Sequence, residues 1–195
     1  VFDLPDGRVA IKMHGFMPEN GADRHEKSDR VPYQSWAQGG YCTLTPGDVT
    51  DNGYVYSWIC EGEREHRWKV DEVDYDGHNA TDLAIRMNED RNREDFCVEV
   101  AQTCAGQNLA VKTFRELLLQ EKVVLEESPL AYWCLGNAIE IQNNYGDLKL
   151  SKRHKDDTER IDPVAAAMNA LARLLVKRSP GRDINEHVLS EDWGI

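Results

Sequence analysis

The stretch from residue 68 to residue 87, WKVDEVDYDGHNATDLAIRM, contains the change of hydrophobic period that decides the fold class. Trp68–Tyr75 is typical of a strand, and the turn-forming pair Asp76-Gly77 ends it. Asn79 is placed to cap a helix, because apolar residues recur from Ala80 to Met87 at the i, i+3, i+4, i+7 spacing. The stretch therefore predicts a strand, a turn and a helix, with the carboxylate of Asp76 where the strand ends.

Strands and helices are predicted on both sides of this unit. The β–α–β units at 68–102 and 96–125 should be right-handed crossovers if their strands are parallel. Residues 18–30 are polar and are predicted to form a surface loop. The whole pattern predicts an α/β fold, with a mixed β-sheet flanked by helices. The further predicted strands are 8–16, 41–44, 96–102 and 123–125, a hairpin has arms 138–141 and 148–150, and further helices are 110–118 and 164–175. The stretch 54–65 is strand-like in composition but is favoured as a helix by its spacing, and 130–135 is a turn or a short helix.

Length and composition limit the class of protein. The 195 residues are 41% apolar and 30% charged, which suits one globular domain, placed at 1–178, with a polar tail at 179–195. No run approaches the roughly 18 apolar residues of a membrane helix. The net charge of −12 excludes affinity for nucleic acid through bulk positive charge, but not an enzyme whose carboxylates hold cations. The five cysteines contain no CxxC pair and are expected to be reduced thiols in a cytosolic protein.

Two aspartates are candidates for chemistry. Asp76 lies at the carboxyl end of a predicted strand, which is where open α/β sheets bind ligands, although a turn also favours Asp before Gly77. Asp162 directly precedes Pro163, so it could simply cap the last helix. Asp74 shares a strand face with Asp76 and could be a second carboxylate of the site, although it is expected to face solvent. GxGxxG, P-loop and GxSxG motifs are absent, so nucleotide binding through a P-loop is excluded.

A loop of mixed charge approaches Asp162. Residues 151–160, SKRHKDDTER, include Lys152, Arg153 and Lys155. These side chains are candidate DNA phosphate contacts, while the carboxylates nearby could hold a cation. An ordinary solvated loop explains the same composition.

Five segments together resemble the nuclease domain of large terminase subunits of tailed bacteriophages. Their order along the chain agrees with that family, and the resemblance covers roughly residues 8–176. The segments are VPYQSWAQGGYCTLTPGDVTD (31–51), VDEVDYDGHNATDLA (70–84), VEVAQTCAGQNLAVKTFRELL (98–118), SPLAYWCLGNAIEI (128–141) and KDDTERIDPVAAAMNALARLL (155–175).

The resemblance implies a ribonuclease H-like fold and a two-ion site for Mg²⁺ or Mn²⁺ held by three acids. Asp76 matches the second acid of the family and Asp162 the third. The first acid belongs to a strand expected before Val1, so the chain looks like a nuclease domain truncated before its first catalytic strand. Asp3-Leu4 echoes the Asp-Leu pair of that strand but falls in the expected turn after it, so the role is not transferred to Asp3.

The same resemblance implies a metal-dependent DNA endonuclease of the viral DNA-packaging motor, cutting concatemeric phage DNA with little sequence specificity. Its implied partners are double-stranded DNA, the portal protein, the small terminase subunit and an ATPase domain of the same full-length chain. The implied location is the cytoplasm of the infected bacterial host, at the procapsid portal vertex. Two alternatives remain open: a non-catalytic module that docks on the portal, for which 179–195 is a candidate docking peptide, and another ribonuclease H-like nuclease such as a junction resolvase.

Overall fold

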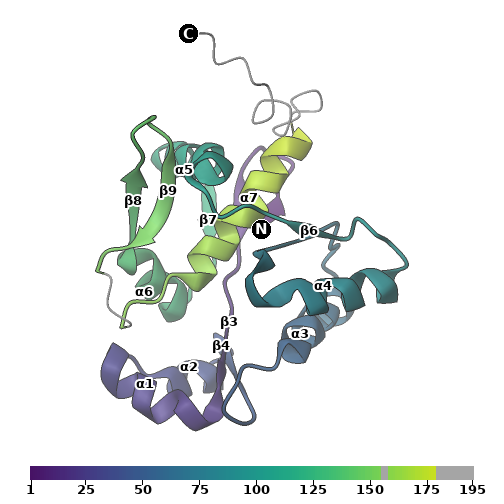
Figure 1. Ribbon diagram of the computed structural model, residues 1–195, viewed down its shortest axis with the longest axis vertical. Coiled ribbons are helices and arrows are strands. Elements are labelled where there is room, and N and C mark those ends of the chain that lie inside the picture. The colour runs from purple at the N-terminus through teal and green to yellow at the C-terminus, as the bar shows by residue number, and fades with distance from the viewer. Residues whose placement is uncertain (155–157, 179–195) are drawn as a thin grey trace.

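The computed structural model describes residues 1–154 and 158–178 of the chain, and in this part strands and helices alternate (Figure 1). The strands are β1 (Phe2–Asp3), β2 (Val9–Ile11), β3 (Gly15–Pro18), β4 (Cys42–Thr45), β5 (Val73–Tyr75), β6 (Cys97–Glu99), β7 (Val123–Leu125), β8 (Ala138–Gln142) and β9 (Leu148–Lys152). The helices are the 3₁₀ turn η1 (Glu19–Gly21), α1 (Ala22–Asp29), α2 (Tyr33–Gln38), α3 (Asn52–Glu65), α4 (Gly77–Arg91), α5 (Cys104–Leu119), α6 (Pro129–Asn137) and α7 (Asp162–Arg178). No described helix is both long enough and apolar enough to cross a membrane.

The strands form small sheets of mixed direction. One sheet has the order β1-β2-β7, with β1 antiparallel and β7 parallel to β2. β3 pairs in parallel with β4, and β5 pairs in parallel with β6. β8 and β9 form the antiparallel hairpin that the sequence predicts. The predicted parallel crossover from β5 through α4 to β6 is confirmed, whereas β7 pairs with β2 and not with β6.

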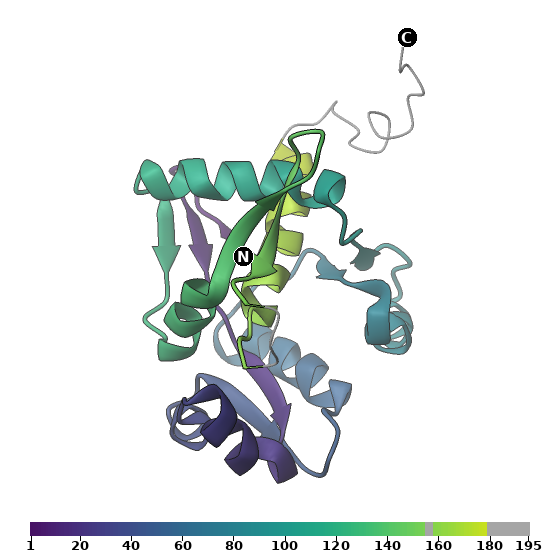
Figure 2. The same cartoon turned by 60° about the vertical axis from the view of Figure 1, so that its left-hand side comes forward.

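The helix α7 runs through the middle of the molecule, between the α5–β9 side and the β5–β6 side (Figures 1 and 2). Val164, Met168 and Leu171 of this helix are buried, and the buried alanines Ala167 and Ala172 let neighbouring elements approach closely. An ion pair also joins this helix to the start of β5. Arg173 Nε donates a hydrogen bond to Oε1 of Glu72, the residue before β5, at 2.8 Å. The core around α7 includes Val9, Ile11, Ala110, Val111, Leu130, Cys134, Val164, Met168 and Leu171.

Residues 18–30 were predicted as a loop, and that prediction is wrong. They form η1 and α1, which together with α2 connect the parallel strands β3 and β4. Within α1 only Ala22 and Asp29 are buried, so no apolar stripe marks the helix in the sequence. This β3–α1–α2–β4 unit lies at one end of the molecule, at the bottom of Figure 1.

Local signals explain several of the other boundaries. The predicted helix over 54–65 is confirmed, and Asp51 caps it by accepting a hydrogen bond from the Gly53 amide at 2.7 Å. The strand predicted over Trp68–Tyr75 is wrong for its first half, where the Trp68 ring packs directly on Gly62 and leaves no room for a Cβ atom. Asn79 does not precede α4, because this helix already begins at Gly77.

Candidate functional site

Asp76 lies at the carboxyl edge of the β5–β6 pair. It follows the last residue of β5 and comes immediately before the first residue of α4, and it is exposed. The two strands are parallel, so both end at this edge. The sequence prediction for the position of Asp76 is therefore confirmed, and its carboxylate is held between two regular elements.

A second carboxylate, which the sequence analysis did not select, lies at the same edge. Glu99 ends β6 directly opposite Tyr75, and a Cβ atom at Gly77 would lie 2.4 Å from Glu99 Oε1. The Glu99 carboxylate thus contacts the residue that follows Asp76. The sequence predicted a strand over 96–102, which placed Glu99 in the middle of the strand, so no signal at a strand end marked it.

Asp74 was expected to face solvent, and this is wrong. Its side chain is 7% exposed and its Oδ1 atom is buried with no hydrogen-bond partner among the described residues. Burial, together with a hydrogen bond to Glu72 and the charge of Glu72, raises the pKa of Asp74 far above the usual range of an aspartate. Asp74 is therefore a neutral acid covered by α7. It does not belong to the exposed carboxyl edge of β5 and β6.

Glu72, its neighbour, remains ionised. Burial acts to raise its pKa, but hydrogen bonds from Arg173, Asp74 and Lys177 outweigh burial and lower the pKa to about 2. Both basic residues belong to the last turns of α7. The strand that leads to Asp76 is thus fixed to α7, the helix whose other end carries Asp162.

Asp162 is the first residue of α7 and is exposed. The amides of Val164 and Ala165 donate to the Ile161 carbonyl oxygen at 2.9 Å, so the helix starts one residue earlier than a capping Asp162 would allow. Burial and the charge of Asp162 raise the pKa of the Cys134 thiol to about 12. Asp162 therefore presents its carboxylate to solvent next to a buried wall that includes Cys134.

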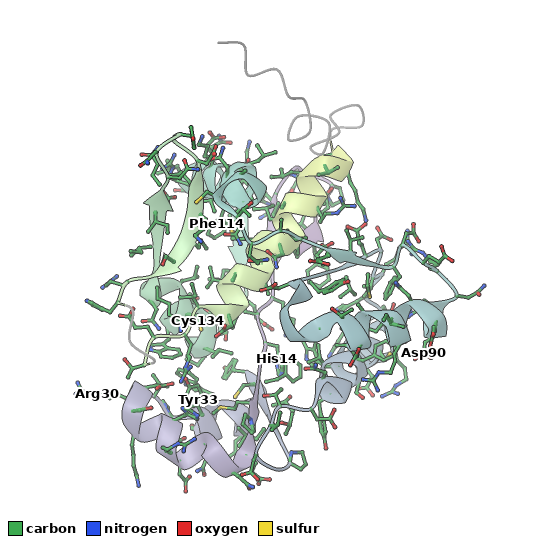
Figure 3. All side chains as sticks on the ribbon, viewed as in Figure 1. His14, Arg30, Tyr33, Asp90, Phe114 and Cys134 are labelled. Atoms are coloured by element: carbon green, nitrogen blue, oxygen red, sulfur yellow. The ribbon has the colours of Figure 1, made fainter. Side chains whose placement is uncertain are left out.

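A cavity of about 610 Å³ opens beside Asp162. Its walls come from the extended segment that includes His14, from α2, α3 and α6, and from the small residues of α7. His14, Tyr33 and Cys134 line it and are labelled in Figure 3. The His14 ring stacks on Trp58 at 4.9 Å, and burial lowers the pKa of this histidine to about 4. The cavity is largely apolar, with Asp162 and Arg160 at its polar end.

Two of the three basic residues chosen from the sequence, Lys152 and Arg153, lie at the end of β9. Lys152 ends β9, and the amide of Arg153 donates to the Asn137 carbonyl oxygen at 3.0 Å. The Asn137 side chain in turn donates to the Arg160 carbonyl oxygen at 3.2 Å, which ties the end of β9 to the segment before Asp162. Arg153 Nη2 also donates to the Gly136 carbonyl oxygen, so part of this guanidinium is already engaged. Lys155 lies outside the described residues.

The acids do not form a closed metal cage. Within residues 1–154 and 158–178, no group of three or more His, Cys, Asp or Glu side chains is arranged to hold a metal ion. Asp76 and Asp162 supply carboxylate oxygens, the ligands that Mg²⁺ and Mn²⁺ prefer, but at least one further ligand has to complete such a site.

Comparison with known families shows the class of protein. The sequence model for the family described as "Terminase large subunit, endonuclease domain" matches residues 1–178. The chain belongs to this family, as the order of its five sequence segments predicted.

Comparison with individual proteins agrees with this assignment. The chain is 28% identical over 172 residues to the "Terminase, large subunit" of Enterobacteria phage HK97, an alignment that covers 84% of this chain and 32% of that protein. The crystal structure of the HK97 bacteriophage large terminase is similar with a TM-score of 0.73 and 23% identity, over 88% of this chain and 35% of that one. The ribonuclease H-like fold is thereby confirmed, and the chain spans about a third of the length of these relatives.

Proposed function

We propose that this domain is the DNA endonuclease of a viral packaging motor and cuts concatemeric phage DNA with little sequence specificity, using Mg²⁺ or Mn²⁺. The observation that carries the proposal is the placement of Asp76 and Asp162. Both are exposed, and each lies at the end of a regular element. The ion pair between Glu72 and Arg173 joins the start of β5, the strand that leads to Asp76, to α7, the helix that begins at Asp162.

The third carboxylate is proposed to come from a strand preceding Val1. β1 pairs antiparallel with β2, with Phe2 opposite Ala10, so a continuation upstream would lie beside Lys12–Gly15. These residues, Val1 and the small side chains Ala166 and Ala170 of α7 all line the cavity. An extended segment of about five residues, roughly 16 Å long, suits this space.

The two neighbouring sheets support the same proposal. β1-β2-β7 and β5-β6 are separate, and Val1, which precedes β1, lies within electrostatic reach of Asp74 on β5. An upstream strand would then run between β2 and β5, and its backbone amides could serve the buried Asp74 Oδ1. An aspartate on it would approach Asp76 and Asp162.

In this proposal the chain's own residues bind and orient the reacting groups. Asp76 and Asp162 would hold two divalent ions, which when bound activate water and stabilise the leaving oxygen of a phosphodiester. Lys152, Arg153 and Lys155 are the proposed contacts to DNA phosphates, which would position the duplex without reading its bases. The further proposed partners are the portal protein, the small terminase subunit and an ATPase domain in the same full-length chain, and the proposed place of action is the portal vertex of the procapsid in the host cytoplasm.

The test is plasmid degradation with Mn²⁺, Mg²⁺ or EDTA, by this chain and by a form extended upstream by one aspartate-bearing strand. The extended form should cut with metal and the shorter form should cut far less. Asp76→Asn and Asp162→Asn in the extended form should each reduce the rate at least about 100-fold, because each removes a charged ligand. Asp90→Asn is the matched control, since Asp90 is exposed and lies at the far end of α4 (Figure 3).

Other outcomes separate the alternatives. Full activity in both site variants would reject the metal-nuclease proposal. If neither form cuts or binds Mn²⁺ by calorimetry, a docking module for the portal becomes the better explanation, and deletion of residues 179–195 should then abolish portal binding. Preferential cutting of four-way junctions over linear duplex would indicate a junction resolvase.

A further inference from the structure

The Asp29 carboxylate, at the end of α1, is the most completely enclosed acid described in the β3–α1–α2–β4 unit. Its side chain is 0% exposed. Oδ2 accepts hydrogen bonds from Tyr33 Oη at 2.8 Å and from Arg160 Nε at 3.2 Å, and Oδ1 accepts one from Ser28 Oγ at 2.6 Å. Three donors therefore satisfy a buried charge, which fixes its position.

Arg160 carries this contact to the site. It is 131 residues away from Asp29 in the chain and only two residues before Asp162. Its guanidinium also contacts His25 of α1, with Nη2 and Nδ1 3.3 Å apart. Its backbone oxygen accepts from Asn137, at the end of α6. The segment just before Asp162 is thus held from two sides. The Arg160 side chain bonds to α1, and the Arg160 backbone oxygen bonds to the end of α6.

A buried ion pair of this kind fixes the positions of its side chains more than it adds to the stability of the protein. Removing two charges from water is costly, and apolar residues of similar size often give equal or greater stability. The aromatic rings around the pair, Tyr33, Trp36 and Trp133, already pack edge to face and provide apolar burial. A carboxylate ligand of a metal, by contrast, loses affinity when the groups that orient it are removed.

We propose that Asp29 is a positioning residue for Asp162, acting through Arg160, and that the β3–α1–α2–β4 unit braces the reactive end of α7. The predicted effect of Asp29 on DNA cleavage rests on the proposed function. The predicted effect of Asp29 on the start of α7, through Arg160, does not, because the stability of that segment can be measured without metal or DNA.

The first measurement is hydrogen exchange of the α7 amides from residue 164 to residue 168, in the 195-residue chain. Asp29→Asn keeps the size of the side chain and removes its charge, while Arg160→Lys keeps the charge and loses the contact with His25. Both should speed exchange in this first part of α7 by about tenfold, with the larger effect in Asp29→Asn. Glu63→Gln is the matched control, because it disrupts another partly buried ion pair, in which Arg91 Nη1 donates to Glu63 Oε1 at 3.1 Å.

The second measurement is Mn²⁺ binding and cleavage in the form extended by the upstream strand. Asp29→Asn should weaken Mn²⁺ binding by about tenfold, the low end for loss of an orienting partner, and raise the Mn²⁺ concentration for half-maximal cleavage by a similar factor. Glu63→Gln should change neither value.

Each outcome has a defined meaning. Normal exchange in the first part of α7 in both folded variants would overturn the positioning role, as would normal Mn²⁺ affinity in Asp29→Asn alongside a lower unfolding midpoint. If the unaltered extended chain neither binds Mn²⁺ nor cuts, the proposed function fails, and the exchange data still decide whether Asp29 holds the start of α7.

Discussion

The two ends of α7 are both anchored by charge, but in different ways. At the first end a single carboxylate, Asp29, is enclosed and receives three donors, one of them Arg160. At the other end two acids, Glu72 and Asp74, face Arg173, and the buried Oδ1 atom of Asp74 has no hydrogen-bond partner among the described residues. The complete cluster lies next to Asp162, where position matters for the proposed chemistry. The incomplete cluster lies where the proposed upstream strand would supply the missing donor.

The largest effect is expected where the cluster is complete. Asp29→Ala leaves Arg160 without its carboxylate and should lower the free energy of unfolding by about 3 kcal/mol, the low end for breaking a buried pair because Arg160 is 31% exposed. Urea unfolding followed by circular dichroism measures it. A loss below about 1 kcal/mol would show that the enclosed pair is no stronger than a surface pair.

Glu72→Ala, at the other end, should cost less. Arg173 and Lys177 are 30% and 44% exposed, so water can solvate both cations once the acid is removed. We expect a loss of about 1–2 kcal/mol in the same urea experiment, in the range of hydrogen bonds to charged groups. A loss equal to that of Asp29→Ala would remove the contrast between the two ends.

The pH dependence of stability should have opposite signs at the two ends. Burial acts to raise the pKa of Asp29, but hydrogen bonds from Ser28, Tyr33 and Arg160 outweigh it and lower the pKa. The stability that ionised Asp29 contributes is therefore fully present above the unfolded-state pKa of about 3.9. It is lost as the pH falls through the lower pKa that Asp29 has in the folded state. Asp74 has a raised pKa, so its contribution is present below about 3.9 and is lost as the pH rises through the folded value.

Two variants isolate these contributions. Asp29→Asn should flatten the fall in unfolding free energy below about pH 4, whereas Asp74→Asn should flatten the fall between about pH 4 and pH 8. Unfolding midpoints in urea from pH 3 to pH 9 provide the test. Parallel curves for Asp74→Asn and the unaltered chain would contradict a neutral Asp74.

The smallest effect is expected at the last residue of α7. Arg178 pairs with Asp3 of β1, and their side chains are 27% and 47% exposed. Hydrogen bonding by Arg178 lowers the pKa of Asp3, against a smaller opposing effect of burial. Arg178→Ala should cost only about 0.5 kcal/mol, as for other exposed pairs. A thermal unfolding midpoint lowered by more than about 4 °C would show that this contact stabilises the protein as much as the contacts of Asp29 and Glu72 do.

The sequence was informative wherever a local pattern reports on burial. The helix over 54–65, the hairpin β8–β9 and the position of Asp76 at a strand end follow from periodicity and turn residues close in the chain. The α1 helix escaped prediction because its buried members are Ala22 and the charged Asp29. The role of Asp29 was equally hidden, since its partner Arg160 is 131 residues away and no local pattern connects them.

The expectation for Asp74 failed for a related physical reason. Alternation along the predicted strand put Asp74 and Asp76 on the same strand face. It does not show which part of that face a helix covers. The last turns of α7 cover Asp74, as its contact with Arg173 shows, while Asp76 lies beyond the strand and is exposed. Only the three-dimensional path of α7 separates a buried acid from an accessible one.

The cavity beside α7 also gives the molecule an optical signal. Trp58 of α3 and Trp133 of α6 both line it, and Trp58 stacks on His14. Any segment that fills the cavity would exclude water from two indole rings and shift their fluorescence emission to shorter wavelength. Trp58→Phe and Trp133→Phe would assign the signal to one wall or the other, so occupancy of the cavity can be followed in solution without attaching a dye.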